Sequence, residues 1–120
     1  MTRSHSELQI LRDELRAFAA AREWEQFHTP KNLSMALMVE AAELIEHFQW
    51  RSEHQSDNLP PEDLLAVGEE LADVLLYLVR LSDRLDIDLF SAALQKLEKN
   101  AAKYPVEQSR GNAKKYTEFK

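Results

Sequence analysis

Apolar residues recur at spacings of three and four along most of the chain, and polar stretches divide them into four runs. This spacing places the apolar side chains on one face of an α-helix, and almost no stretch alternates as a β-strand does. Residues typical of helix N-termini precede the runs, namely Ser4 or Ser6, Thr29 with Pro30, Pro61, and Asp88. We therefore expect helices over about residues 5–23, 30–50, 61 to a break at 86, and 88–104.

The third predicted helix is apolar on more than one side, which is typical of a helix at the centre of a fold or at a subunit interface. The polar residues 51–61 before it end in two prolines and are expected to form a loop. The pattern predicts an all-α protein with a four-helix bundle-like subunit that forms oligomers. We expect one domain over residues 1–120, with 105–120 as a C-terminal tail.

Composition narrows the possible partners. The 120 residues carry a formal net charge of −6 and no cysteine. The acidic balance argues against a nucleic-acid or anionic membrane partner. The absence of cysteine excludes disulfides, thiolate zinc sites and cysteine nucleophiles, and it is compatible with a reducing compartment. The sequence shows neither a signal peptide nor an apolar run long enough for a membrane span, so we expect a soluble cytoplasmic protein.

Two acidic pairs interrupt the apolar runs of the second and third predicted helices. Glu40 and Glu43 are three residues apart, as are Glu70 and Asp73. This spacing puts both carboxylates of a pair on one helix face. If the helices pack as an antiparallel hairpin, the four carboxylates gather and repel one another unless a cation joins them. Oxygen ligands favour Mg²⁺ or Mn²⁺, and bound Mg²⁺ commonly completes its shell with water and substrate phosphate.

The same acids are compatible with two other interpretations. They could form the solvated stripe of ordinary amphipathic helices, which an isolated Glu-x-x-Glu pair usually is. They could also belong to a di-iron bundle, but that architecture needs Glu-x-x-His motifs on two helices. His47 follows Glu43 by four residues and the third helix has no histidine, so iron is disfavoured. The motifs of P-loop proteins, serine hydrolases and HExxH zinc proteases are absent from the sequence.

Aromatic and cationic residues occur where a nucleotide could use them. Candidate base-binding residues flank the second helix: Trp24, His28 and Trp50. Aromatic faces stack on bases and a histidine can read a base edge, although both tryptophans could equally be core or interface residues. Candidate phosphate-binding residues follow later in the chain: Lys96, Asn100, Lys103 and Arg110. The first three share a helix face, although Lys103 could simply complement the helix dipole.

Several motifs occur together along the chain: Trp24-Glu-Gln-Phe-His28, Val39-Glu-Ala-Ala-Glu-Leu44, Phe48-Gln-Trp50, Glu69-Glu-Leu-Ala-Asp-Val-Leu-Leu-Tyr-Leu78 and Lys103-Tyr-Pro-Val106. With them the chain resembles the MazG-like all-α nucleotide pyrophosphohydrolases, and within that superfamily most of all the dCTP pyrophosphatase branch. The likeness extends over about residues 8–118. It implies hydrolysis of a nucleoside triphosphate to the monophosphate and pyrophosphate, with Mg²⁺, in a homo-oligomer.

The resemblance also implies roles for individual residues. The implied metal ligands are Glu40, Glu43, Glu70 and Asp73. The implied substrate contacts are Trp24 and Trp50 around the base, Tyr77 near the sugar or base, and Lys96 and Asn100 at the phosphates. Better-known members of the branch carry a base-contacting histidine on the first helix, where this chain has Leu15. Glu43 or Glu46 could accept the proton of the attacking water, and the sequence leaves that choice open.

We therefore expect a Mg²⁺-dependent enzyme that converts a nucleoside triphosphate and water to the monophosphate and pyrophosphate. Its expected substrates are dCTP or related, modified pyrimidine deoxynucleotides, in a house-cleaning role. Two alternatives stay open: a non-catalytic helical oligomer with an acidic surface or structural cation site, and a phosphoribosyl-ATP pyrophosphohydrolase, which the paired tryptophans disfavour. We expect a nucleotide partner, a homo-oligomer that is a dimer or tetramer, and neither a nucleic-acid nor a membrane partner.

Overall fold

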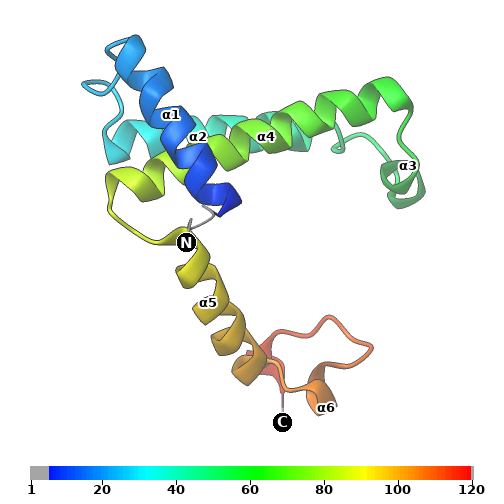
Figure 1. Ribbon diagram of the computed structural model, residues 1–120. Helices are drawn as coiled ribbons and strands as arrows, with labels where there is room; N and C mark the ends of the chain where they lie inside the picture. The colour runs from blue at the N-terminus through cyan, green and yellow to red at the C-terminus, as the bar shows by residue number, and fades with distance from the viewer. Residues whose placement is uncertain (1–5, 120) are drawn as a thin grey trace. The chain divides into compact units, whose positions relative to one another are not determined.

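The structure, a computed structural model, describes residues 6–119 and is all-helical over that range, with no strand. Its elements are α1 (Glu7–Ala21), α2 (Pro30–Glu46), α3 (Glu53–Asp57), α4 (Pro61–Arg84), α5 (Leu89–Lys103), α6 (Val106–Ser109) and the 3₁₀ turn η1 (Tyr116–Glu118) (Figure 1). The chain divides into two compact units, Met1–Ile87 and Asp88–Lys120. The prediction of an all-α protein is confirmed.

A capping box begins α1. The Ser6 Oγ accepts from the Gln9 backbone N–H at 3.2 Å, and the Gln9 side chain accepts from the Ser6 N–H at 2.9 Å. Ser6 is therefore the N-cap, and the other predicted candidate, Ser4, lies outside the described residues. The helix ends at Ala21 rather than near residue 23, because Glu23 has a positive φ of 54°, which is incompatible with a right-handed helix.

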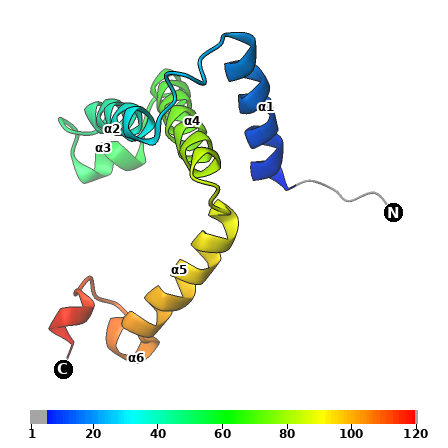
Figure 2. The same ribbon diagram turned by 90° about the vertical axis from the view of Figure 1, so that its left-hand side faces the viewer.

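The helices α2 and α4 form an antiparallel hairpin and lie side by side, while α4 lies between α2 and α1 (Figure 2). At the start of α2, the Thr29 hydroxyl accepts from the Asn32 N–H at 3.2 Å. Pro30 and Pro61 occupy the first turns of α2 and α4, where a missing N–H costs nothing. These starts agree with the prediction, and the hairpin brings the acid-bearing faces of the two helices together.

Two details between α2 and α4 differ from the prediction. The second helix ends at Glu46 instead of near Trp50, and residues 47–50 form a turn. The stretch expected to be a loop contains the short helix α3. Ser52 and Gln55 stabilise it with a capping box, in which Ser52 Oγ accepts from the Gln55 N–H at 3.1 Å. A five-residue helix has too few positions to show a hydrophobic period, so local capping decides it.

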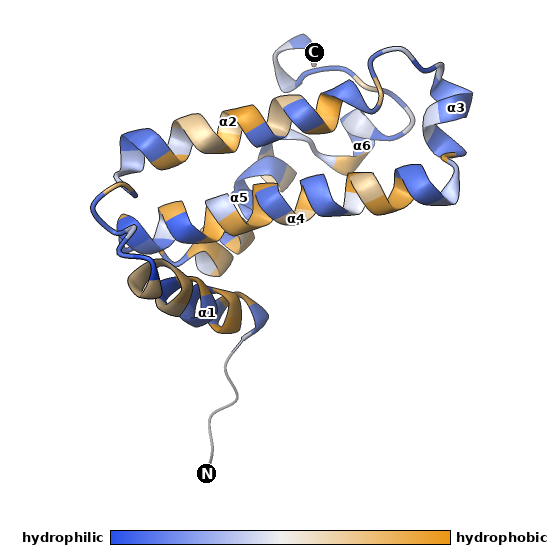
Figure 3. Cartoon of the chain, turned by 90° about the horizontal axis from the view of Figure 1, so that it is seen from above, coloured by the Kyte–Doolittle hydropathy of each residue, from blue (hydrophilic) through white to orange (hydrophobic). Residues whose placement is uncertain are grey.

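The buried apolar core of the first unit is small. Four apolar side chains are buried in the described part of the chain: Ala19, Leu33, Val67 and Val79. Hydrophobic positions instead occur on several sides of α2 and α4 (Figure 3). We call two exposed stripes the outer face of α2 (Met35, Met38, Ala42 and Ile45) and the outer face of α4 (Leu64, Leu71, Leu75 and Leu78). Their spacings of three, four, seven and eleven residues place each set on one side of its helix.

The second unit contains α5, α6 and η1. Asp88 caps α5 by accepting from the Ser91 N–H at 3.0 Å, and the helix ends at Lys103, in agreement with the prediction. The Tyr104 ring then meets Tyr116 edge to face at 5.9 Å, which packs the end of α5 against η1. Among the described helices of the whole chain, none combines the length and apolarity that a membrane crossing requires.

Candidate functional site

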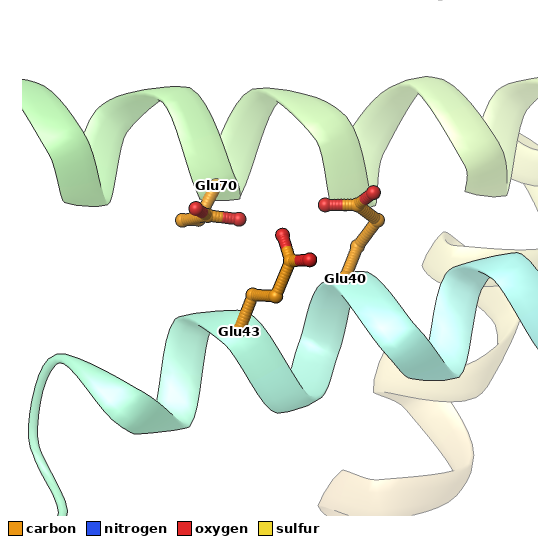
Figure 4. A group of neighbouring side chains, drawn as sticks. All are labelled: Glu40, Glu43 and Glu70. Carbon is orange, nitrogen blue, oxygen red and sulfur yellow. The ribbon is translucent and has the colours of Figure 1, made fainter.

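Three carboxylates meet between α2 and α4. Glu40 and Glu43 extend from α2 and Glu70 from α4 into the space between the helices (Figure 4). One oxygen of each lies within 4.8 Å of the others, and all three side chains are partly buried. The three-residue spacing on α2 and the antiparallel packing produce this group. Asp73, the fourth predicted ligand, lies on α4 three residues after Glu70, is exposed, and is not part of the group.

Burial and mutual repulsion raise the pKa values of two of the gathered acids. Burial is the largest cause that raises the pKa of Glu40 to about 7, and hydrogen bonding and repulsion from Glu43 add to it. Burial, followed by the interaction with Glu43, also raises the pKa of Glu70. Glu40 Oε2 and Glu70 Oε2 are buried and have no hydrogen-bond partner among the described residues. One basic group approaches the cluster, with His47 Nε2 at 3.8 Å from Glu70 Oε1.

This donor set fits a hard divalent cation. Every donor in the group is a carboxylate oxygen, which is the ligand type that Mg²⁺, Mn²⁺ and Ca²⁺ prefer. The two unpartnered oxygens are buried groups that a cation would satisfy, and its charge would offset the repulsion that raises the pKa of Glu40. The cluster can therefore bind a metal ion.

A cavity of about 260 Å³ lies among α1, the segment that joins α1 to α2, and α4. Its lining residues are Leu15, Phe18, Trp24, His28, Asp73, Leu76, Tyr77 and Arg80. Mostly apolar and aromatic walls with a few polar groups are typical of small-molecule sites. Asp73 belongs to this wall and lies about one helical turn from Glu70, so the cavity is adjacent to the carboxylate cluster.

The turn after α1 positions two predicted base-binding residues at this cavity. The Trp24 N–H donates to the Ala19 carbonyl at 2.9 Å, which fixes the reversal of the chain. The Trp24 ring meets the Phe18 and His28 rings edge to face, with centroid distances of 5.7 and 6.0 Å. Tyr77 reaches the same cavity from α4. The structure therefore brings together Trp24, His28 and Tyr77.

Arg80 is a residue of this cavity that the sequence analysis did not single out. Its Nε donates to His28 Nδ1 at 3.1 Å, and its Nη1 lies 3.7 Å from Asp83 Oδ2. The available signal was a single arginine within the apolar run of residues 74–81. Leu15, Phe18 and Leu76 give no comparable signal as cavity residues, because apolar cavity walls and ordinary core positions have the same pattern.

Trp50 and Glu46 lie outside both the cavity lining and the carboxylate group. Trp50 follows the end of α2 and is 88% exposed. Glu46 is the exposed last residue of α2. Within one chain, the structure therefore places one of the two predicted base-stacking tryptophans at the cavity.

The four predicted phosphate-binding residues belong to the second unit, and all are exposed: Lys96, Asn100, Lys103 and Arg110. Lys103 also has a structural contact, because its Nζ lies 4.9 Å from the centroid of the Tyr116 ring. Phosphate binding by these residues stays a prediction.

The sequence of the described helices matches a known family. Residues 35–119 fit the model of the MazG-like family, and this range contains all three clustered glutamates and Asp73. The chain belongs to the MazG-like family.

Individual MazG-like relatives are similar over most of this chain. This chain is 50% identical to dCTP pyrophosphatase 1 of Mus musculus and 46% identical to dCTP pyrophosphatase 1 of Homo sapiens. Each match extends over 104 residues, which make up 85% of this chain. The matched part spans 61% of each relative's length. The crystal structure of a pyrophosphatase from Archaeoglobus fulgidus superposes with a TM-score of 0.80 at 42% identity, covering 88% of this chain and 98% of that one.

Proposed function

We propose that this MazG-like protein is a Mg²⁺-dependent nucleoside triphosphate pyrophosphohydrolase. Its proposed substrates are dCTP or related, modified pyrimidine deoxynucleotides, which it converts with water to the monophosphate and pyrophosphate. The observation that carries the proposal is a cluster of carboxylates with unpartnered buried oxygens beside an aromatic-lined cavity. Similarity to the mammalian dCTP pyrophosphatases supports the choice of substrate.

The proposed ligands of Mg²⁺ are Glu40, Glu43, Glu70 and Asp73. When bound there, the metal would neutralise the triphosphate and lower the pKa of the attacking water. The three clustered carboxylates and Asp73 would hold the metal, and Asp73 also lines the cavity proposed for the nucleotide.

In the proposed reaction, the water oxygen forms a bond to the α-phosphorus while the bond from that phosphorus to the bridging oxygen breaks. The bond's electron pair leaves with pyrophosphate. A carboxylate accepts the proton of the water, and the candidates are Glu43 in the cluster and Glu46 at the end of α2. No covalent enzyme intermediate is required.

The cavity would hold the base. Trp24 offers an aromatic face, and Tyr77 and His28 contribute polar groups to the wall of the same cavity. The exposed side chain of Trp50 is available to close the cavity of a second copy and complete the predicted base sandwich. We assign phosphate binding to the cationic and amide groups of the second unit: Lys96, Asn100, Lys103 and Arg110.

We also propose a homo-oligomer, a dimer or a tetramer, of four-helix bundle-like subunits. The outer faces of α2 and α4 support it, since they expose apolar stripes that a second copy can bury. We propose that residues 1–120 form one domain.

Pyrophosphate release from a panel of canonical and modified deoxynucleoside triphosphates, with and without Mg²⁺, tests the function. We expect Mg²⁺-dependent release with dCTP or a modified pyrimidine nucleotide as the best substrate. Glu70→Gln should lower the rate about a hundredfold because it removes a charged ligand. Glu69→Gln, at the exposed neighbouring position, is the matched control and should retain the rate. Silence of the wild type on the whole panel would support a non-catalytic helical oligomer instead.

A further inference from the structure

Arg80 is charged and buried in an apolar part of α4. Its side chain is 6% exposed, and it is the buried charged residue among those that the structure describes. A buried charge is costly unless hydrogen bonds and an opposite charge compensate it. Asp83 supplies the charge at 3.7 Å, and it is itself held by Arg16, whose Nε donates to Asp83 Oδ2 at 2.7 Å. Arg80 is therefore fixed from one side by a carboxylate that is anchored to α1.

On its other side, Arg80 determines which nitrogen of His28 carries a hydrogen. The Arg80 Nε–H can only donate, so His28 Nδ1 must accept at 3.1 Å and must be free of hydrogen. A neutral imidazole that accepts at Nδ1 carries its hydrogen at Nε2. Burial, and then the positive charges of Arg80 and Arg84, lower the pKa of His28, which keeps the ring neutral.

The two residues also share the wall of the proposed base cavity. Arg80 and His28 line it together with Tyr77, among apolar neighbours. The Tyr77 hydroxyl can rotate to donate or to accept, so it adapts to either edge of a base. A histidine of fixed tautomer cannot adapt, and in a partly apolar cavity an unmatched polar group is penalised.

We propose that Arg80 is a positioning residue that holds His28 as an Nε2–H donor, and that this donor selects cytosine over thymine and uracil. This inference rests on the proposed pyrophosphohydrolase function. The ring nitrogen N3 of cytosine accepts a hydrogen bond, whereas N3 of thymine and uracil carries a hydrogen that would oppose a second donor. Arg80 itself needs no contact with the base.

The tautomer can be measured directly, without substrate. Long-range ¹⁵N–¹H correlation spectra at neutral pH report which ring nitrogen of each histidine is protonated, and a His28→Gln variant assigns the His28 signals among the four histidines. We expect His28 to be protonated at Nε2 alone in the wild type and to become a mixture of both tautomers in Arg80→Met. Protonation at Nδ1 in the wild type, or an unchanged tautomer in Arg80→Met, would overturn the inference.

Kinetics with dCTP, dTTP and dUTP test the selection. In Arg80→Met we expect KM for dCTP to rise with little change in kcat, and the preference for dCTP in kcat/KM to fall about tenfold. Arg80→Lys keeps a buried charge but lacks the directed Nε–H, so it should also lose the preference. It provides the same readouts if Arg80→Met does not fold. Lys31→Met, which removes an exposed positive charge on α2 away from the cavity lining, is the control and should keep the preference.

The outcomes distinguish a failure of the proposed pyrophosphohydrolase function from a failure of the positioning role of Arg80. An active wild type whose dCTP preference persists in Arg80→Met and Arg80→Lys overturns the role of Arg80 and leaves the proposed function intact. Rescue of the preference by Arg80→Lys shows that charge alone suffices and also overturns the positioning role. A wild type that releases no pyrophosphate from any nucleotide overturns the function and the base selection together, while the spectra still decide whether Arg80 sets the tautomer.

Discussion

The Glu40 carboxyl group is partly buried and lies among other acidic groups. Burial and its acidic neighbours raise its pKa to about 7, from an ordinary value of 4.5. The metal-free protein therefore holds a proton there that the unfolded chain releases, which couples folding to pH. The same arrangement is useful for metal binding, because a cation that displaces the proton also removes the repulsion.

This coupling predicts how the metal-free protein responds to pH. Below pH 4.5 both states of Glu40 are protonated, and between 4.5 and about 7 only the folded state stays protonated. The unfolded state then binds fewer protons, so the free energy of unfolding falls as pH rises through this window. Thermal unfolding in a chelator should show this decline, and Mg²⁺ should raise Tm more at the alkaline end of the window than at the acidic end.

A Glu40→Gln variant isolates the effect. We expect a shallower decline of Tm with pH in the chelator, with a remaining slope from Glu70, whose pKa is also raised. His28 acts with the opposite sign, because its lowered pKa adds stability that is lost as pH falls below 6.5. That contribution is present in both proteins and cancels in the comparison. An identical pH slope in Glu40→Gln and the wild type would contradict the prediction.

The sequence was sufficient to predict that three glutamates gather, but not that Asp73 lies outside their group or that Arg80 pairs with His28. The i, i+3 spacing and a hairpin between neighbouring helices determine which faces meet, so Glu40, Glu43 and Glu70 could be placed in advance. Arg80 and His28 are 52 residues apart in sequence. Their contact depends on how the turn after α1 packs on α4, and no local pattern encodes that packing.

Between elements, a polar link joins α1 to α4. Arg16 on α1 donates two hydrogen bonds to the Asp83 carboxylate on α4, at 2.7 and 2.5 Å. The pairing lowers the pKa of Asp83, so the carboxylate stays charged and continues to compensate Arg80. A bidentate pair of this kind fixes orientation as well as distance, which helps to hold the α1 wall of the cavity in place.

Removing Asp83 should destabilise the protein more than removing its partner Arg16. We expect Asp83→Ala to lower the free energy of unfolding by about 1–3 kcal/mol, because it leaves the buried Arg80 without its carboxylate. Arg16→Ala should cost less, since Arg16 is exposed and Asp83 can still pair with Arg80. Denaturant unfolding measures both. Glu69→Ala, which removes an exposed carboxylate elsewhere on α4, is the control and should have a small effect. A loss of stability in Asp83→Ala no larger than the loss in Glu69→Ala would contradict the prediction.

Helix starts were easier to predict than helix ends, and the reason lies in side-chain chemistry. Thr29, Pro61 and Asp88 mark their starts with a cap or a fixed φ, and each acts locally. The ends of α1 and α2 lack a terminal glycine, so their turns are set by packing rather than by a residue visible in the sequence.

At the scale of the whole molecule, the exposed apolar stripes are the feature that supports the proposed oligomer. The outer faces of α2 and α4 carry large side chains, among them Met38 at 68% exposure, while the buried core is small. Surfaces of this kind are characteristic of subunit interfaces. Sequence patterns predict such faces but not the symmetry that joins them, because dimers and tetramers can bury the same stripe.

The proposed oligomer predicts that one charge in the outer face of α2 separates the subunits. Met38→Glu would place an unpaired carboxylate in the interface, so we expect it to reduce the mass measured by light scattering from a multiple of 13.9 kDa to the monomer value. Tm of the wild type should rise with protein concentration, and that dependence should vanish in the variant. Gln95→Glu adds the same charge at an exposed position of α5 and should leave the mass unchanged. If the wild type has a mass of 13.9 kDa at micromolar concentration, the proposed oligomer is wrong, and the apolar stripes must serve another purpose.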